Sequence, residues 1–265
     1  MKLRLPFIKN PPLVSVVRLA GAIGMAGRGT LNDHALAPIL EKAFRRSKPA
    51  AVALEINSPG GSPVQSSLIG SRIRRLSEET KVPVIAFVED VAASGGYWLA
   101  SAADEIWADG GSIIGSIGVI MSGFGAPEFL ARHGIERRVH TAGKSKSMLD
   151  PFRPEKKEDV ARLKVLLGDL HANFIDHVKT RRGDRLDQTQ DLFTGEFWLA
   201  GRAAELGLID GIAHLKPKMQ ERFGDKVQFR QYGLRRPLLA RFSAQMTQEA
   251  LGGIEERAAF ARFGL

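Results

Sequence analysis

Apolar runs and amphipathic stretches alternate along the first hundred residues. Residues 13–19, 50–56 and 82–88 are mostly apolar, and proline, glycine, polar or charged positions bound them. Runs of this length and composition are typical of strands buried on both faces of a sheet. Between them, residues 31–46 and 63–79 place apolar side chains three and four positions apart, which is the spacing of an amphipathic helix. Strands alternating with helices imply right-handed crossovers and a largely parallel sheet, so the pattern predicts an α/β fold.

The remainder of the chain predicts shorter and less regular elements. We expect helices at 97–103, 154–182 and 201–207, and strands at 105–108, 135–140 and 226–232. Residues 237–263 have the pattern of a loosely amphipathic tail. Because no internal repeat is present, a duplicated domain is not expected. We therefore predict a basic N-terminal extension at 1–12, a folded domain at 13–215 and a basic C-terminal extension at 216–265.

The charge is unevenly distributed. The formal net charge is +9, and the first ten residues carry Lys2, Arg4 and Lys9 with no acidic residue. Residues 216–265 hold ten Lys or Arg against five Asp or Glu. A basic balance permits contact with anionic lipid or nucleic acid. No basic run interleaved with aromatic residues and no zinc-finger spacing occurs, so we expect no nucleic-acid partner.

Several site classes are excluded or disfavoured by residue usage. The chain has no cysteine, which excludes disulfides, cysteine nucleophiles and thiolate metal sites. Its six histidines form no metal-binding spacing, so we expect solvated or packed histidines, no metal and no cofactor. The apolar run at 13–17 is too short to span a bilayer, and Arg18 follows it. We expect a cytoplasmic or peripherally membrane-associated protein.

The most informative residue is Ser94. It follows the strand-like run at 82–88 and precedes a helix-like run, within the stretch Val-Ala-Ala-Ser-Gly-Gly-Tyr-Trp at 91–98. A serine on a tight strand-to-helix turn can present its Oγ to a substrate while backbone N–H groups point the same way. The alternative is a helix cap, because serine is a preferred N-cap residue.

A second glycine-rich turn follows the neighbouring predicted strand. It reads Asn-Ser-Pro-Gly-Gly at 57–61. A tetrahedral oxyanion needs two N–H donors at about 2.7–3.1 Å, and glycine lets the backbone approach a ligand that closely. The N–H groups of Gly60 or Gly61 and of Gly95 are therefore candidate oxyanion donors. A plain turn remains the alternative for 57–61.

A serine nucleophile also needs a base, and a lysine can serve when it is neutral. Burial favours the neutral amine of a lysine because it lowers the pKa. Burying a lysine costs free energy, and such a cost is typical of functional sites. The polar loop at 143–152 supplies Lys144 and Lys146, and composition does not choose between them. A solvated loop is the alternative.

These residues fall within a series of motifs that resembles the signal peptide peptidase A (SppA) family of Ser–Lys peptidases, in its short single-domain form. The similar segments occur in order between about residues 13 and 212. They are Asn-Ser-Pro-Gly-Gly at 57–61, Ala-Ser-Gly-Gly-Tyr at 93–97, Ala-Asp-Glu-Ile at 103–106 with Gly-Ser-Ile-Gly-Val at 115–119, the lysine loop at 143–153, and Phe-Thr-Gly-Glu at 193–196 with 203–210.

The resemblance implies a ClpP/crotonase-like α/β fold of stacked ββα units, with 13–215 as the peptidase domain. It implies that Ser94 attacks the peptide carbonyl, that Lys146 rather than Lys144 takes the proton, and that Ser116 orients the lysine. It also implies a homo-oligomeric ring, with each site near a contact between protomers, and substrates that are extended or unfolded segments such as residual signal peptides.

Two features depart from the family pattern. Family members typically carry an N-terminal membrane anchor, whereas we detect none here; the basic residues near the start could give a weak interfacial contact instead. Ser147 stands beside the expected base, where an acidic residue is common in relatives.

Two other functions are compatible with the same fold. A crotonase-type acyl-thioester enzyme also uses backbone oxyanion donors but needs no Ser94–Lys146 pair. A catalytically silent scaffold would not need the serine, the lysine and the glycine turns together.

Overall fold

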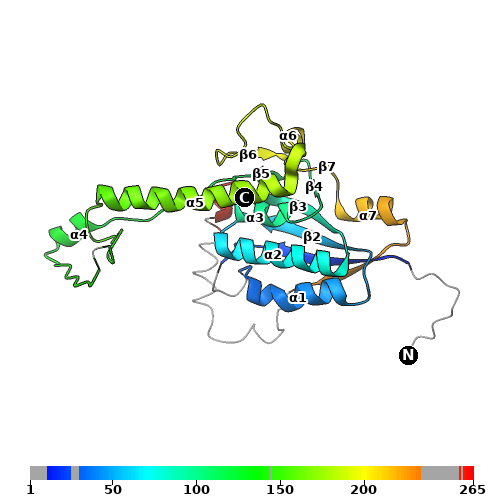
Figure 1. Cartoon of the computed structure of the whole chain (residues 1–265), viewed down its shortest axis with the longest axis horizontal. Coiled ribbons are helices and arrows are strands. Elements are labelled where there is room, and N and C mark those ends of the chain that lie inside the picture. The colour runs from blue at the N-terminus through cyan, green and yellow to red at the C-terminus, as the bar shows by residue number, and fades with distance from the viewer. Residues whose placement is uncertain (1–10, 25–29, 144, 234–256, 258) are drawn as a thin grey trace.

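The structure is a computed structural model that describes residues 11–24, 30–143, 145–233, 257 and 259–265. An eight-stranded sheet forms its centre, with the main strand order β6-β5-β3-β2-β1-β8 (Figure 1). β4 pairs with β3 and also with β7. All of these pairs are parallel except β5 with β6, which confirms the expected α/β class and largely parallel sheet. The strands are β1 (Leu13–Ala20), β2 (Ala51–Ser58), β3 (Val84–Ala93), β4 (Glu105–Ala108), β5 (Ile113–Gly115), β6 (Phe197–Leu199), β7 (Gly211–Ile212) and β8 (Gln228–Tyr232).

Helices cover both faces of this sheet. They are α1 (Asp33–Arg45), α2 (Pro63–Thr80), α3 (Gly95–Ser101), α4 (Pro127–Arg132), α5 (Lys157–Arg182), α6 (Ala200–Glu205) and α7 (Leu215–Phe223), with a 3₁₀ turn η1 (Gly183–Arg185) after α5. Side-chain caps start α1 and α2. The Asn32 side chain accepts a hydrogen bond from the Ala35 N–H, and Ser62 caps α2 just before Pro63.

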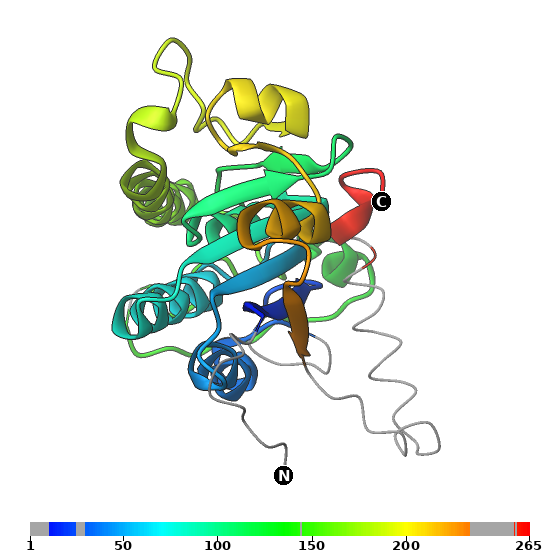
Figure 2. The same ribbon diagram turned by 90° about the vertical axis from the view of Figure 1, so that its right-hand side faces the viewer.

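Alternating side chains of the central strands divide the core in two. Val52, Leu54 and Ile56 of β2 belong to the larger cluster, which includes side chains of α1, α2, α3, α5 and α6. Ala51 and Ala53 point the other way and belong to a smaller cluster with Met219 of α7. Figure 2 shows α1, α2 and α5 on one side of the sheet, with α7 on the other. Burial on both faces explains why these strands read as continuous apolar runs.

One segment leaves this layered body. Residues 118–156, which we call the arm, carry α4 and extend beyond the N-terminal end of α5, away from the sheet (Figure 1). The arm is held together by its own contacts, since the Ala126 N–H donates to the Pro151 carbonyl at 2.7 Å and Arg137 pairs with Asp150 at 3.3 Å. The Phe152 N–H and Arg137 lower the pKa of Asp150.

The strand expected at 135–140 is wrong. These residues lie in the arm without strand structure, and most of their side chains are exposed. Arg138 pairs with Glu136 within the segment itself, at 2.6 Å. A strand needs a neighbouring strand for its backbone hydrogen bonds, and the described part of the chain offers none there.

The fold continues past residue 215, where we placed the start of the C-terminal extension. α7 buries Met219, and β8 pairs in parallel with β1. The first ten residues and most of the tail expected at 237–263 lie outside the described residues, and the domain limits stay a prediction. Within the described ranges, no helix combines the length and apolar character needed to cross a membrane.

Candidate active site

Ser94 lies on the sharp turn between β3 and α3. Its φ of 51° and ψ of −122° place it among the described non-glycine residues with positive φ. A non-glycine residue in such a conformation costs on the order of 1–3 kcal/mol and persists only where the surroundings hold it. Here the surroundings are close backbone: a Cβ on Gly96 would collide with the backbone of Ser58, at the end of β2. A serine on a tight strand-to-helix turn is the arrangement that the sequence predicted here.

The Ser94 side chain does not cap the helix that it precedes. Ser94 occupies the N-cap position of α3 but forms no capping hydrogen bond through its side chain. Its backbone N–H donates to the Gly115 carbonyl at 2.8 Å, and its carbonyl accepts from the Trp98 N–H at 3.0 Å. The backbone is therefore fixed on both sides, whereas the Oγ of this half-buried residue has no hydrogen-bond partner among the described residues.

The turn at 57–61 lies directly against Ser94. Gly60 has a φ of +100°, and a Cβ built on it would lie 2.8 Å from both the Ser94 Cβ and the Gly95 nitrogen. Only glycine permits this approach. The Gly60 N–H faces the Ser58 Oγ at 3.3 Å, whereas the N–H groups of Gly61 and Gly95 have no hydrogen-bond partner in the described part of the chain. The structure thus brings the candidate oxyanion donors Gly60, Gly61 and Gly95 to the serine.

Ser116 belongs to the neighbouring turn. It follows β5 with a φ of 52°, and its N–H donates to the Glu196 carbonyl at 2.6 Å. Because the Ser94 N–H donates to the carbonyl of the preceding Gly115, the turns of the two serines are joined by a backbone hydrogen bond.

Lys146 is not brought to this site within one chain. Its side chain is exposed, its N–H closes a turn onto the Gly143 carbonyl at 3.1 Å, and no contact with Ser94 or Ser116 is present among the described residues. The lysine loop lies in the arm, at the far end of α5 from the sheet (Figure 1). Lys144 lies outside the described residues.

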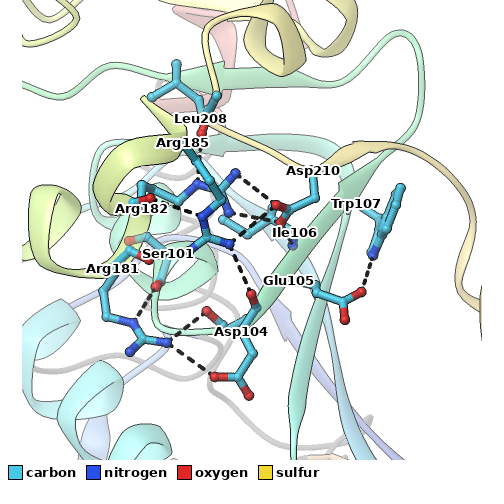
Figure 3. Close-up of polar contacts among 12 residues, drawn as sticks. Ser101, Asp104, Glu105, Ile106, Trp107, Arg181, Arg182, Arg185, Leu208 and Asp210 are labelled. Atoms are coloured by element: carbon cyan, nitrogen blue, oxygen red, sulfur yellow. Dashed lines mark hydrogen bonds and ion pairs between the residues drawn. The ribbon is translucent and has the colours of Figure 1, made fainter. Parts of the chain in front are cut away.

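The helix α5, which packs against α3, is held by a polar network that the sequence analysis did not predict. Arg182, only 2% exposed, pairs with Asp210 at 2.9 Å, and Arg181 pairs with Asp104 at 3.3 Å (Figure 3). Burial acts to raise the pKa of Asp210, but hydrogen bonds from Arg182 and from the Ile106 N–H outweigh it and hold the pKa below its usual value. The network ties α5 to β4 and to the loop before β7.

Aromatic contacts complete this support. The His177 ring stacks on Trp98 of α3, with centroids 4.3 Å apart and planes 7° apart, and Phe174 packs on the same indole at 5.1 Å. The buried Tyr97 hydroxyl donates to the Leu208 carbonyl at 2.7 Å, and burial raises the pKa of Tyr97. The signal for the Asp210 contact was the closing motif at 203–210; nothing in the sequence signalled the histidine contacts.

Two other features of the described residues are separate from this site. A cavity of about 420 Å³ opens on the α7 side of the sheet, lined by Glu89, Asp109, His214 and neighbours, and it includes none of the expected site residues. No group of three or more His, Asp or Glu side chains that could hold a metal ion occurs in the described ranges.

The fold is an α/β fold whose strained serine turn follows a central strand of the sheet. Residues 77–223, more than half of the chain, match the family model described as "Peptidase family S49". The chain belongs to this family.

Two relatives named as proteases agree with this assignment, and a third has a different name. "Protease 4" of Haemophilus influenzae is 34% identical over 217 residues, which cover 79% of this chain and 34% of the relative. "Serine protease SPPA, chloroplastic" of Arabidopsis thaliana is 32% identical over 203 residues, covering 76% of this chain and 29% of the relative. A Brucella abortus protein named "Na(+)/H(+) antiporter NhaA" is 49% identical over 271 residues, covering 95% of this chain and 37% of the relative. The chain thus spans about a third of the length of these three relatives.

Proposed function

We propose that this protein is a serine endopeptidase that uses Ser94 as nucleophile and Lys146 as general base. The observation that carries the proposal is the Ser94 turn, which holds a strained serine with an uncommitted Oγ against the Gly60 turn. Membership of peptidase family S49 supports the same reaction class.

Each residue has a defined chemical task. The Ser94 Oγ attacks the scissile carbonyl carbon while the neutral Lys146 amine accepts the hydroxyl proton. The N–H groups of Gly61 and Gly95, with Gly60 beside them, stabilise the tetrahedral oxyanion. The protonated lysine then gives its proton to the leaving amine, and an acyl-enzyme remains on Ser94. Water, deprotonated by Lys146, hydrolyses this ester, and the Ser116 hydroxyl orients the lysine throughout.

We propose that Lys146 reaches Ser94 from a neighbouring copy of the chain. Within one chain the lysine is exposed, so the burial that favours a neutral amine must come from another molecule. The arm and the α5 segment up to residue 170 carry exposed apolar side chains, and clustered exposed apolar side chains mark an interaction surface. They are Ile120, Met121, Phe124, Phe129, Ile135, Phe152, Val165, Leu166 and Leu170. A homo-oligomeric ring would cover them and complete each site.

The substrates we propose are extended or unfolded segments, with residual signal peptides among them. A ring with enclosed sites admits an extended chain more readily than a folded protein. We also propose a weak peripheral contact with membranes through the basic ends of the chain, because basic segments are attracted to anionic lipid. Sedimentation with anionic but not with zwitterionic vesicles would be the sign of this contact, and equal sedimentation with both would contradict it.

The test of the dyad uses single variants and their mixture. Ser94→Ala and Lys146→Ala should each abolish hydrolysis of fluorescein-labelled denatured casein, whereas Lys164→Ala, an exposed lysine of α5, should not. Wild-type activity should rise toward alkaline pH, because a lysine acts as base only when neutral. A serine-reactive fluorophosphonate should label wild-type protein but not Ser94→Ala.

Oligomers that contain both single variants should regain activity, because some sites would combine an intact Ser94 with an intact Lys146 from another copy. Retained turnover in either single variant would contradict the dyad. Inactive single variants without regain on mixing would contradict completion by a neighbouring copy. Tight binding of coenzyme A without peptide hydrolysis would favour the crotonase-type alternative, and neither activity nor labelling would favour a silent scaffold.

A further inference from the structure

Two histidines of α5 contact the backbone close to the two serines. The His171 Nε2 lies 3.0 Å from the Ile117 carbonyl, one residue after Ser116. The His177 Nε2 lies 3.1 Å from the Trp98 carbonyl in α3, the helix that starts after Ser94, and 3.1 Å from the Ser101 Oγ. One helix thus contacts the supports of both serines.

The chemistry of these contacts fixes which ring nitrogen carries a proton. A carbonyl oxygen only accepts hydrogen bonds, so in both histidines the Nε2 must be the donor. Such a bond holds the ring in one orientation and one tautomer. His177 is held further by its stack on Trp98.

Hydrogen bonds and burial hold the turn around Ser116 in place. The Ser116 N–H donates to the Glu196 carbonyl, and the Gly118 N–H donates to the Ser116 carbonyl at 2.9 Å. The Ile117 side chain is fully buried. The Ile117 carbonyl lies next to the start of the arm, and the His171 side chain binds it.

We infer that His171 is a positioning residue for the Ser94–Ser116 pair, with His177 as the anchor that fixes α5 against α3. This inference rests on the proposed function. Because the Ser94 N–H is bonded to the Gly115 carbonyl, a shift of the 115–118 turn is transmitted to both serines. A misplacement of about 1 Å at a reacting group can cost on the order of a hundredfold in rate.

The experiment compares three variants of the full chain. His171→Leu removes the donor with little change in size, His171→Gln retains an N–H donor, and Asp169→Ala alters an exposed residue of the same helix as the control. Steady-state hydrolysis of a fluorogenic peptide gives kcat and KM. Amide hydrogen exchange of peptides covering 92–98 and 113–120 reports the two turns without reference to activity.

We expect His171→Leu to lower kcat by about tenfold to a hundredfold with KM nearly unchanged. Exchange in both turns should quicken by about tenfold, while exchange in the β1 and β2 peptides stays as in the wild type. His171→Gln should recover most of the lost kcat, and Asp169→Ala should match the wild type.

Wild-type kcat in a folded His171→Leu protein would overturn the inference. So would equal loss in His171→Leu and His171→Gln, or faster exchange throughout the sheet, because each indicates a general effect on folding. Failure of the Ser–Lys proposal is distinguishable: Ser94→Ala would then stay active, while the exchange of the two turns would still respond to His171→Leu.

Discussion

Replacing His177 with glutamine tests how mild acid acts on the folded protein. Burial lowers the pKa of His177 from 6.5 to about 4; the hydrogen bond to the Trp98 carbonyl opposes this shift, and the charge of Arg181 adds to it. A histidine that stays neutral in the folded state and becomes charged in the unfolded state makes stability depend on pH.

The sign and size follow from these two pKa values. Above pH 6.5 the imidazole is neutral in both states, so it contributes no pH dependence. As the pH falls below 6.5 the unfolded chain binds a proton that the folded protein does not bind until about pH 4. The pKa difference corresponds to about 3 kcal/mol of stability lost below pH 4, of which about 2 kcal/mol is lost between pH 7 and pH 5.

Glutamine at position 177 keeps an N–H donor for the Trp98 carbonyl but cannot be protonated. Urea unfolding at pH 7 and pH 5, at one fixed protein concentration, measures the free energy of unfolding of each protein. The loss on going to pH 5 should be smaller in His177→Gln than in the wild type by about 2 kcal/mol. His140→Gln, which replaces an exposed histidine of the arm, should lose as much as the wild type.

Equal losses in the wild type and in His177→Gln would refute this reasoning. It would show that His177 binds its proton equally well in both states, and hence that the stack on Trp98 opens at little cost.

Two further predictions concern the supports of the site. Gly60→Ala places a Cβ 2.8 Å from the Ser94 Cβ at a φ of +100°, so labelling of Ser94 by a fluorophosphonate should slow by about tenfold or more. Gly110→Ala, where a Cβ meets nothing within 4 Å, should be labelled at the wild-type rate. Equal labelling rates in the two variants would contradict the proposed contact. Asp210→Asn leaves the buried Arg182 charge without its carboxylate and should lower the free energy of unfolding by about 3 kcal/mol in urea melts at pH 7. A change below about 1 kcal/mol would mean that solvent or the asparagine amide oxygen compensates the Arg182 charge.

The parts of the fold that the sequence predicts well are those with long, regular patterns. The buried strands β1, β2 and β3 are continuous apolar runs, and the helices α1, α2 and α5 have apolar spacings that repeat over several turns. The turn at Ser94 was predictable because glycine and small residues are what a close backbone approach requires. Its strain was not, because a positive φ at a serine is imposed by the packed strands around it.

Short elements and long-range pairs could not be predicted in the same way. β5 and β6 are three residues each, too short for a period, and they pair across more than eighty positions of sequence. The wrong strand at 135–140 had a suitable residue pattern but no partner strand. The position of Lys146 relative to Ser94 follows from the direction in which α5 projects, and this direction is set by contacts of Trp98, His177 and Arg182 that no local pattern encodes.

The projecting half of α5 has a consequence for folding. The buried side chains of this helix are Phe174, Val178 and Arg182, all in its C-terminal half, so the turns before His171 depend mainly on their own backbone hydrogen bonds. An isolated helix of about 12–15 residues is only marginally stable in water. In a single chain the two regions therefore differ in stability. The sheet opens only when the whole domain unfolds, whereas the N-terminal half of α5 frays and re-forms many times for each global unfolding.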